Sequence, residues 1–89
     1  MAKKRRKLNK DFEREIYTSK KNVELVLAKI YDIDDENIQK EYISAFNLVV
    51  HLYDQLRVHY DEQGFNDNSE QLLKNYKNAF DLFKSEFEI

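Results

Sequence analysis

The scarcity of helix-breaking residues is the feature that most constrains this chain. Its 89 residues include no proline and a single glycine, Gly64. A β-protein of this length needs many tight turns, and those turns usually contain glycine or proline. Long helices joined by few loops are therefore expected, and we predict an all-α fold.

Apolar residues repeat at helical spacing in three segments. Alternating steps of four and three residues keep apolar side chains on one face of a helix. The pattern predicts helices over about residues 10–32, 35–63 and 68–87. The residues expected to be most buried are Ile16, Val23, Ile30, Tyr42, Val49, Leu52, Leu56, Leu72, Tyr76, Ala79 and Phe83.

Residues that favour helix ends lie between these segments. The acidic run 34–36 supplies a cap oxygen and negative charge at the start of the second helix. Gly64 is suited to a left-handed cap at the end of that helix. Asp67 and Glu70 have the spacing of a capping box, which predicts the start of the third helix.

The two joints are short, which predicts that neighbouring helices run antiparallel. An average apolar spacing of about 3.5 residues favours shallow, left-handed crossing angles near +20°. We predict an up-down-up antiparallel three-helix bundle, left-handed, with the second helix longest and central. Residues 10–89 are expected to form this single domain, and residues 1–9 a flexible basic arm.

Composition excludes several classes of site and of protein. The chain has no cysteine, and no apolar run approaches the roughly 18 residues of a membrane span. His51 and His59 lack the further ligands that a metal site requires, so we expect His59 to be partly buried and His51 to lie on the surface. No nucleophile, base and oxyanion donor stand out together. We predict a cytoplasmic protein that is not an enzyme and holds no cofactor.

Basic residues concentrate at the start of the chain. Six lysines and arginines and no acidic residue fall within residues 1–10, although the formal net charge of the chain is −2. Such a run can grip phosphates with little sequence specificity. The candidate polyanion-binding residues are Lys3, Lys4, Arg5, Arg6, Lys7, Lys10, Arg14 and Lys21. The alternatives are a solvated tail, a contact with the acidic second helix, an anionic membrane surface and an acidic protein.

The second helix carries more apolar residues than a single seam requires. Phe46, Tyr53 and Tyr60 lie one heptad apart, and Arg57 lies beside them in sequence. Two chains related by a twofold axis could bury this line against itself. We therefore predict a protein interface at these four residues and a homodimer through the second helix. Burial of the aromatic line inside the bundle, or its contact with a different protein, is the alternative.

Together these features predict a small non-enzymatic binding or regulatory module that acts by protein–protein interaction through its second and third helices. A nucleic-acid-associated accessory protein that uses residues 3–21 is the alternative. The size and helical architecture resemble those of small immunity proteins that protect bacteriocin producers, and of small phage and plasmid regulators. Abundant Lys, Asn and Ile beside scarce Gly, Pro and Ala are typical of AT-rich genomes and indicate a bacterial or phage origin.

Overall fold

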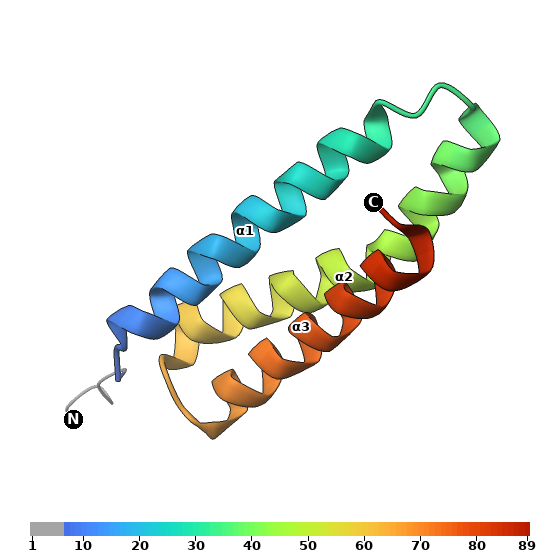
Figure 1. Cartoon of the computed structure of the whole chain (residues 1–89). Helices are drawn as coiled ribbons and strands as arrows, with labels where there is room; N and C mark the ends of the chain where they lie inside the picture. The colour runs from blue at the N-terminus through green and yellow to red at the C-terminus, as the bar shows by residue number, and fades with distance from the viewer. Residues whose placement is uncertain (1–6) are drawn as a thin grey trace.

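The structure, a computed structural model, describes residues 7–89, which form three α-helices (Figure 1). Helix α1 spans Lys10–Tyr31, α2 spans Glu36–Gln63 and α3 spans Asp67–Phe87. No strand occurs within the described residues, and α2 is the longest helix at 28 residues. The predicted all-α fold is confirmed, and each predicted helix boundary lies within one residue of the observed one.

Helices α1 and α2 each have an N-cap residue. Its side-chain oxygen accepts backbone N–H groups that have no partner within the helix. Before α1, Oδ1 of Asn9 accepts the N–H of Phe12 at 3.0 Å. Before α2, Oδ1 of Asp35 accepts the N–H of Asn37 at 2.9 Å and that of Ile38 at 3.1 Å. The acidic run 34–36 thus supplies the cap oxygen that its sequence indicated.

The cap of α3 differs from the predicted one. Oδ1 of Asn66 accepts the N–H of Ser69 at 2.9 Å, and the N–H of Asn66 donates to Oγ of Ser69 at 3.2 Å. This reciprocal pair is a capping box shifted by one residue from the expected pair Asp67 and Glu70, because the helix starts one residue earlier. The Ser69 hydroxyl, which is fully buried, also donates to the carbonyl of Gly64 at 2.7 Å. The box therefore ties the start of α3 to the end of α2.

Helix α2 packs against both of the other helices, and more extensively against α3 than against α1. The two connections, residues 32–35 and 64–66, lie at opposite ends of α2 (Figure 1). The backbones of α1 and α3 approach each other far less closely. A long side chain bridges them, since the Tyr76 hydroxyl donates to the carbonyl of Ser19 at 3.3 Å. Helix α2 is therefore the central element of the packing.

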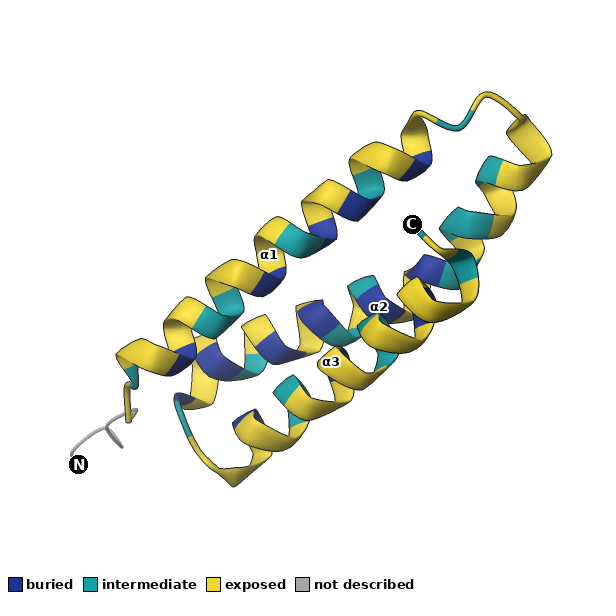
Figure 2. Ribbon diagram, viewed as in Figure 1, coloured by how far each residue is buried: buried dark blue, intermediate teal, exposed yellow. Residues whose placement is uncertain are grey.

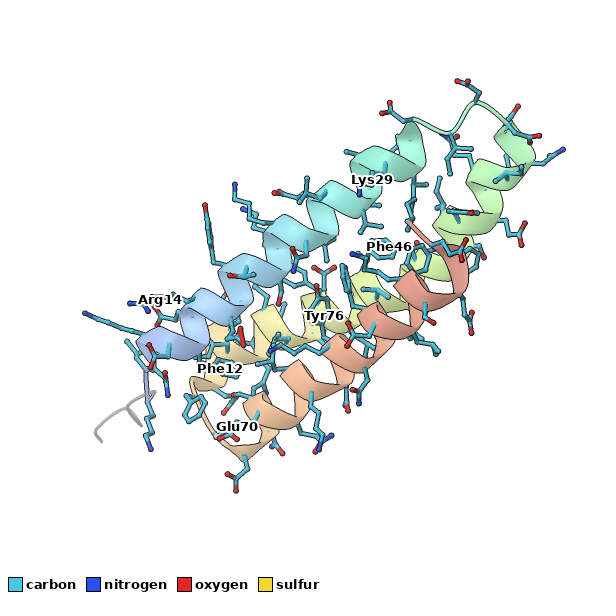
Figure 3. The ribbon with its side chains drawn as sticks, in the orientation of Figure 1. Phe12, Arg14, Lys29, Phe46, Glu70 and Tyr76 are labelled. Carbon is cyan, nitrogen blue, oxygen red and sulfur yellow. The ribbon has the colours of Figure 1, made fainter. Side chains whose placement is uncertain are left out.

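Buried residues form a stripe along the facing sides of the helices (Figure 2). The rings of Phe46 and Phe83 have centroids 4.7 Å apart, and those of Tyr53 and Tyr76 lie 6.1 Å apart. Figure 3 shows Phe46 and Tyr76 between the helices. The buried apolar residues are Phe12, Val23, Val26, Ile30, Phe46, Val49, Tyr53, Leu56, Tyr60, Tyr76 and Phe83.

The expected core agrees with this set in part. The predicted residues that are buried are Val23, Ile30, Val49, Leu56, Tyr76 and Phe83. The predicted residues that are only half-buried are Ile16, Tyr42, Leu52, Leu72 and Ala79. These five residues lie at the edge of the core and are partly exposed to solvent. The apolar pattern identified the buried face of each helix, but not which residues lie at the centre of that face.

The chain just before α1 is held against the joint between α2 and α3. The N–H of Phe65 donates to the carbonyl of Lys7 at 2.6 Å. The N–H of Asn9 donates to the Tyr60 hydroxyl at 3.0 Å, and this hydroxyl donates to Oε2 of Glu13 at 2.6 Å. Lys7 and Asn9, which belong to the arm expected over residues 1–9, thus contact the folded domain, and the flexibility of the arm stays a prediction. Residues 1–6 lie outside the described part of the chain.

Candidate functional site

Two leucines lie exposed beside a shallow apolar groove between α2 and α3. Leu48 of α2 is 59% exposed and Leu82 of α3 is 60% exposed. The groove has a volume of about 300 Å³. Its lining residues are Ala45, Leu48, Val49, Asn78, Ala79, Leu82, Phe83, Glu86 and Phe87. Side chains of this kind normally occupy a core, so the groove is an apolar feature left on the surface.

The groove continues along both helices as a surface of mostly uncharged residues, which we call the α2–α3 face. Spacing of three and four residues aligns its members along one side of each helix. The members are Ala45, Leu48, His51, Leu52 and Gln55 from α2, and Gln71, Leu72, Asn75, Asn78, Ala79 and Leu82 from α3. Charged residues make up 36% of the whole chain. Charged side chains border this face, with Glu86 in the groove and Asp54 and Glu62 in the hollow beside His51.

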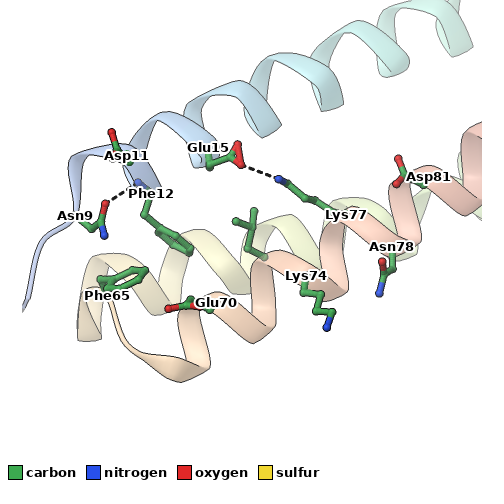
Figure 4. Close-up of a pocket in the computed structure, with 11 residues that line it drawn as sticks. Asn9, Asp11, Phe12, Glu15, Phe65, Glu70, Lys74, Lys77, Asn78 and Asp81 are labelled. Carbon is green, nitrogen blue, oxygen red and sulfur yellow. Dashed lines mark hydrogen bonds and ion pairs between the residues drawn. The ribbon is translucent and has the colours of Figure 1, made fainter.

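Four charged residues of α3 lie on its other side, in a cleft of about 650 Å³ between α1 and α3 (Figure 4). The floor of this α1–α3 cleft holds Phe12 and Phe65, whose rings meet edge to face with centroids 5.0 Å apart. Lys77 and Glu15 form an ion pair across the cleft, with Nζ 2.7 Å from Oε1. The cleft is therefore bridged at the surface and apolar beneath.

The charged residues lining the α1–α3 cleft are Asp11, Glu15, Glu70, Lys74, Lys77 and Asp81. The side chains of the bridging pair are nearly half exposed, 49% for Lys77 and 44% for Glu15. Water screens such a pair, which contributes at most about 1 kcal/mol. Nearby, the Ser19 hydroxyl is buried and donates to the Glu15 carbonyl at 2.8 Å. The lining residues thus offer a hydrated, mixed-charge cleft without a nucleophile beside a base.

The interface predicted on α2 is corrected by the structure. Phe46, Tyr53 and Tyr60 are only 1%, 7% and 6% exposed, so their line lies in the core instead of on a surface. This aromatic line faces the region where α1 and α3 both contact α2. Burial of the line inside the bundle was the alternative considered from sequence. Arg57 is the exposed member of the predicted set, and its Nη1 pairs with Oδ2 of Asp61 at 3.2 Å.

The predicted polyanion-binding residues fall into three groups. Lys3, Lys4, Arg5 and Arg6 lie outside the described residues. Lys7 lies beside the α2–α3 joint, and its Nζ is 6.0 Å from the centroid of the Phe65 ring. Lys10, Arg14 and Lys21 are exposed on α1, and their spacing places them on one side of that helix.

The exposed basic side of α1 also carries an aromatic ring. Nζ of Lys21 lies 5.3 Å from the centroid of Tyr17, which is 60% exposed. Arg14 is already paired with Asp11, at 3.6 Å between Nη1 and Oδ1, although both side chains are largely exposed. One side of α1 therefore carries three cations and one aromatic ring, and Asp11 lies near its N-terminal end.

Burial perturbs two tyrosines in the core. It raises the pKa of Tyr76 to about 12 from the ordinary value of 10.0. Burial also raises the pKa of Tyr53, whose ring lies against Tyr76. Both hydroxyls hold their protons at neutral pH, since a buried phenolate loses its hydration. These tyrosines serve packing and not proton transfer.

We expect alkaline pH to destabilise the fold through these tyrosines. The unfolded chain releases the Tyr76 proton near pH 10, whereas the folded chain keeps it until about pH 12. Stability is therefore complete below pH 10 and falls as the pH rises from 10 towards 12. Urea titrations at several pH values measure this loss. The variant Tyr76→Phe should lose less stability across the same interval, and an equal loss in both proteins would contradict the assignment.

The His, Asp and Glu side chains of residues 7–89 are dispersed over the surface. Within this range, no three His, Asp or Glu side chains converge to hold a metal ion. His51 is exposed, and the half-buried His59 places Nε2 3.0 Å from Oδ1 of Asn66, in agreement with the sequence expectation for both rings. In the same range, no helix combines the length and the apolar content needed to cross a bilayer.

Comparison of the chain with protein-family models, curated proteins and solved structures finds no match. The resemblance to small immunity proteins and to phage or plasmid regulators stays a prediction. Among the surfaces of residues 7–89, the α2–α3 face exposes the apolar pair Leu48 and Leu82 beside one groove.

Proposed function

We propose that this protein is a small non-enzymatic module that binds another protein chain through the α2–α3 face. The observation that carries the proposal is the pair Leu48 and Leu82, both more than half exposed beside one mostly apolar groove, which Glu86 also lines. Exposure of such side chains to water is unfavourable, by about 25 cal/mol for each Å² of apolar area. A partner that covers the leucines would recover this free energy.

The polar residues of the α2–α3 face support the same proposal. The centres of protein interfaces are depleted of Lys, Glu and Asp, because desolvation of an unpaired charge is costly. Amides take their place on this face, and the side chain of Gln71 donates to Oδ1 of Asn75 at 2.9 Å. Asn and Gln can re-form hydrogen bonds with a partner without an ionic penalty.

We also propose that the three helices form a left-handed up-down-up bundle. Two connections of a few residues each and the packing of α2 against both neighbours favour this topology. The apolar spacing of about 3.5 residues favours the left-handed crossing. This arrangement supports α2 and α3 as a rigid platform for binding.

The basic side of α1 favours a second candidate, a nucleic-acid-associated accessory protein. Lys10, Arg14 and Lys21 are exposed on one side of the helix, with Tyr17 among them. Cations of this kind contact phosphates, and an exposed ring can stack on an unpaired base. The acidic neighbour of Arg14 weakens this candidate relative to the α2–α3 face.

Site-specific photo-crosslinking in the native host tests both candidates. A photo-reactive amino acid replaces Leu82 in one variant and Lys21 in the other, so that each candidate surface is probed separately. The proposal predicts protein adducts from position 82 and none from position 21. Nucleic-acid adducts from position 21, with no protein adduct from position 82, would favour the second candidate. Absence of any adduct at position 82 would overturn the proposed function.

A further inference from the structure

We infer that the α1–α3 cleft is a binding site for a small organic cation, an amine or guanidine attached to an aromatic or alkyl body. The cleft has a volume of about 650 Å³, within the roughly 300 to 1,000 Å³ of typical ligand sites. Such sites combine an apolar floor with a few polar groups that orient the ligand. Neither Leu48 nor Leu82 lines this cleft, so its ligand goes beyond the proposed function and does not depend on it.

The floor of the cleft supplies apolar contact for the body of the ligand. Phe12 and Phe65, which we call the aromatic pair, come from α1 and from the α2–α3 joint (Figure 4). Leu73 of α3 also lines the cleft and packs against the same buried cluster. The floor stays open because α1 and α3 approach each other less closely than either approaches α2. A flat hydrocarbon body that covers these side chains would displace water from apolar surface.

Two carboxylates lie near the aromatic pair and can hold the cationic group. Glu70 is in the first turn of α3, and Asp11 is in the first turn of α1 (Figure 4). Within residues 7–89, Glu70 forms no ion pair, although Lys74 lies one turn further along the helix. Asp11 pairs with Arg14 at 3.6 Å, and both side chains are largely exposed, so water screens this pair. A ligand cation can therefore pair with Glu70 without displacing another cation.

The chain itself places an ammonium group against the aromatic pair. Nζ of Lys7 lies 6.0 Å from the centroid of Phe65, near the limit of about 6 Å within which a ring attracts a cation. Lys7 does not line the cleft, so the surface that Phe65 presents to the cleft is left to a second cation. Repulsion between the two cations is opposed by the carboxylates of Glu70 and Asp11.

The charges around the cleft favour a cation over an anion. Four of the six charged lining residues are acidic, namely Asp11, Glu15, Glu70 and Asp81. The basic residues Lys74 and Lys77 lie further along α3 than Glu70, and Lys77 already pairs with Glu15. This ion pair spans the cleft beyond the aromatic pair (Figure 4), which favours a small ligand over an extended chain. An anion at the aromatic pair would be repelled by Asp11 and Glu70.

An NMR titration of the isotope-labelled full chain tests the inference with 2-phenylethylamine, an aromatic cation at neutral pH. We expect backbone amide shifts that saturate below about 10 mM amine and are largest at Phe12, Phe65 and Glu70. The matched probe is 3-phenylpropionate, which has the same ring but a carboxylate in place of the ammonium group. It should bind at least roughly threefold more weakly. No saturable shift at the cleft, or equal affinity for the two probes, would overturn the inference.

Two exposed glutamates of α3 provide a variant and its control. Glu70→Gln removes the charge at the cleft with almost no change in shape, and it should weaken binding of 2-phenylethylamine roughly threefold. Glu86→Gln removes a charge from the opposite side of the same helix, where Glu86 lines the α2–α3 groove, and it should bind like the wild type. Circular dichroism should be unchanged in both variants. Equal affinities of Glu70→Gln and Glu86→Gln would overturn the inference, whereas crosslinking from position 82 tests the proposed function separately.

The aromatic contribution is tested by Phe65→Leu, which keeps an apolar side chain but removes the ring. Loss of the cation–ring attraction should weaken binding of 2-phenylethylamine roughly threefold. Binding of 3-phenylpropionate should change less, because its charged group gains nothing from the ring face. Equal changes for the two probes would contradict a cation held against the aromatic pair.

Discussion

Leu56→Ala is expected to lower the free energy of unfolding by about 2 to 5 kcal/mol. The Leu56 side chain is 0% exposed and packs in one buried cluster with Phe12 and Tyr60. Its truncation removes buried apolar area and leaves a cavity, because neighbouring rings relax only in part. A small domain has only about 5 to 15 kcal/mol of stability, so the loss is a large fraction of the total. Urea unfolding followed by circular dichroism measures it.

Leu52→Ala is the matched control for this prediction. Leu52 lies one turn earlier on the same helix, but it is half-buried at the edge of the core. Water already reaches part of its side chain, so truncation removes less buried area and creates no closed cavity. We expect a loss less than half of that for Leu56→Ala. Equal losses in the two variants would contradict the observed rotation of α2.

This pair of leucines illustrates what the sequence could predict about the fold. The helices were predictable because each depends on local information: apolar spacing, cap oxygens and the lack of proline. The burial of Leu56 relative to Leu52 depends on how α2 is rotated between two neighbours, which is not local information. Both residues lie in one apolar seam of the sequence, so the pattern ranks them as equals.

The candidate site was harder to predict for the same reason. Tyr53 and Tyr60 suggested a surface because they extend the apolar face of α2 beyond one seam, yet α1 and α3 together cover them. Leu48 and Leu82 stand outside the main seams as single apolar residues, 34 positions apart in sequence. Packing of α2 against α3 is what brings them to one groove. A signal was present, since Leu48, His51 and Gln55 in α2 and Gln71, Asn75, Asn78 and Leu82 in α3 are uncharged and follow helical spacing.

The fixed N-terminal segment also depends on contacts between distant parts of the chain. The Tyr60 hydroxyl forms hydrogen bonds with Asn9, which is 51 positions away in sequence, and with Glu13, which is 47 positions away. The composition of residues 1–9 indicates only a basic and polar stretch. Hydrogen bonds connect Lys7 and Asn9 to the end of α2 and the α2–α3 joint, which contains Gly64.

Gly64→Ala is expected to lower the free energy of unfolding by about 1 to 3 kcal/mol. Gly64 is buried and has φ 77° and ψ −157°, a backbone region that is essentially restricted to glycine. Its N–H donates to the Tyr60 carbonyl at 2.8 Å, and its own carbonyl accepts the Ser69 hydroxyl at 2.7 Å. These bonds hold the backbone in place, so an added Cβ has to be accommodated as strain. Thermal and urea unfolding measure the loss.

Gly64→Asn distinguishes the observed conformation from the left-handed cap that the sequence predicted. Asparagine tolerates the ordinary left-handed region, where ψ is about +47°. A left-handed cap at Gly64 would therefore accept asparagine better than alanine. The observed ψ of −157° lies far from that region, and Gly64 is buried. We expect Gly64→Asn to be at least as destabilising as Gly64→Ala, and clear rescue by asparagine would show that the joint adopts the ordinary cap instead.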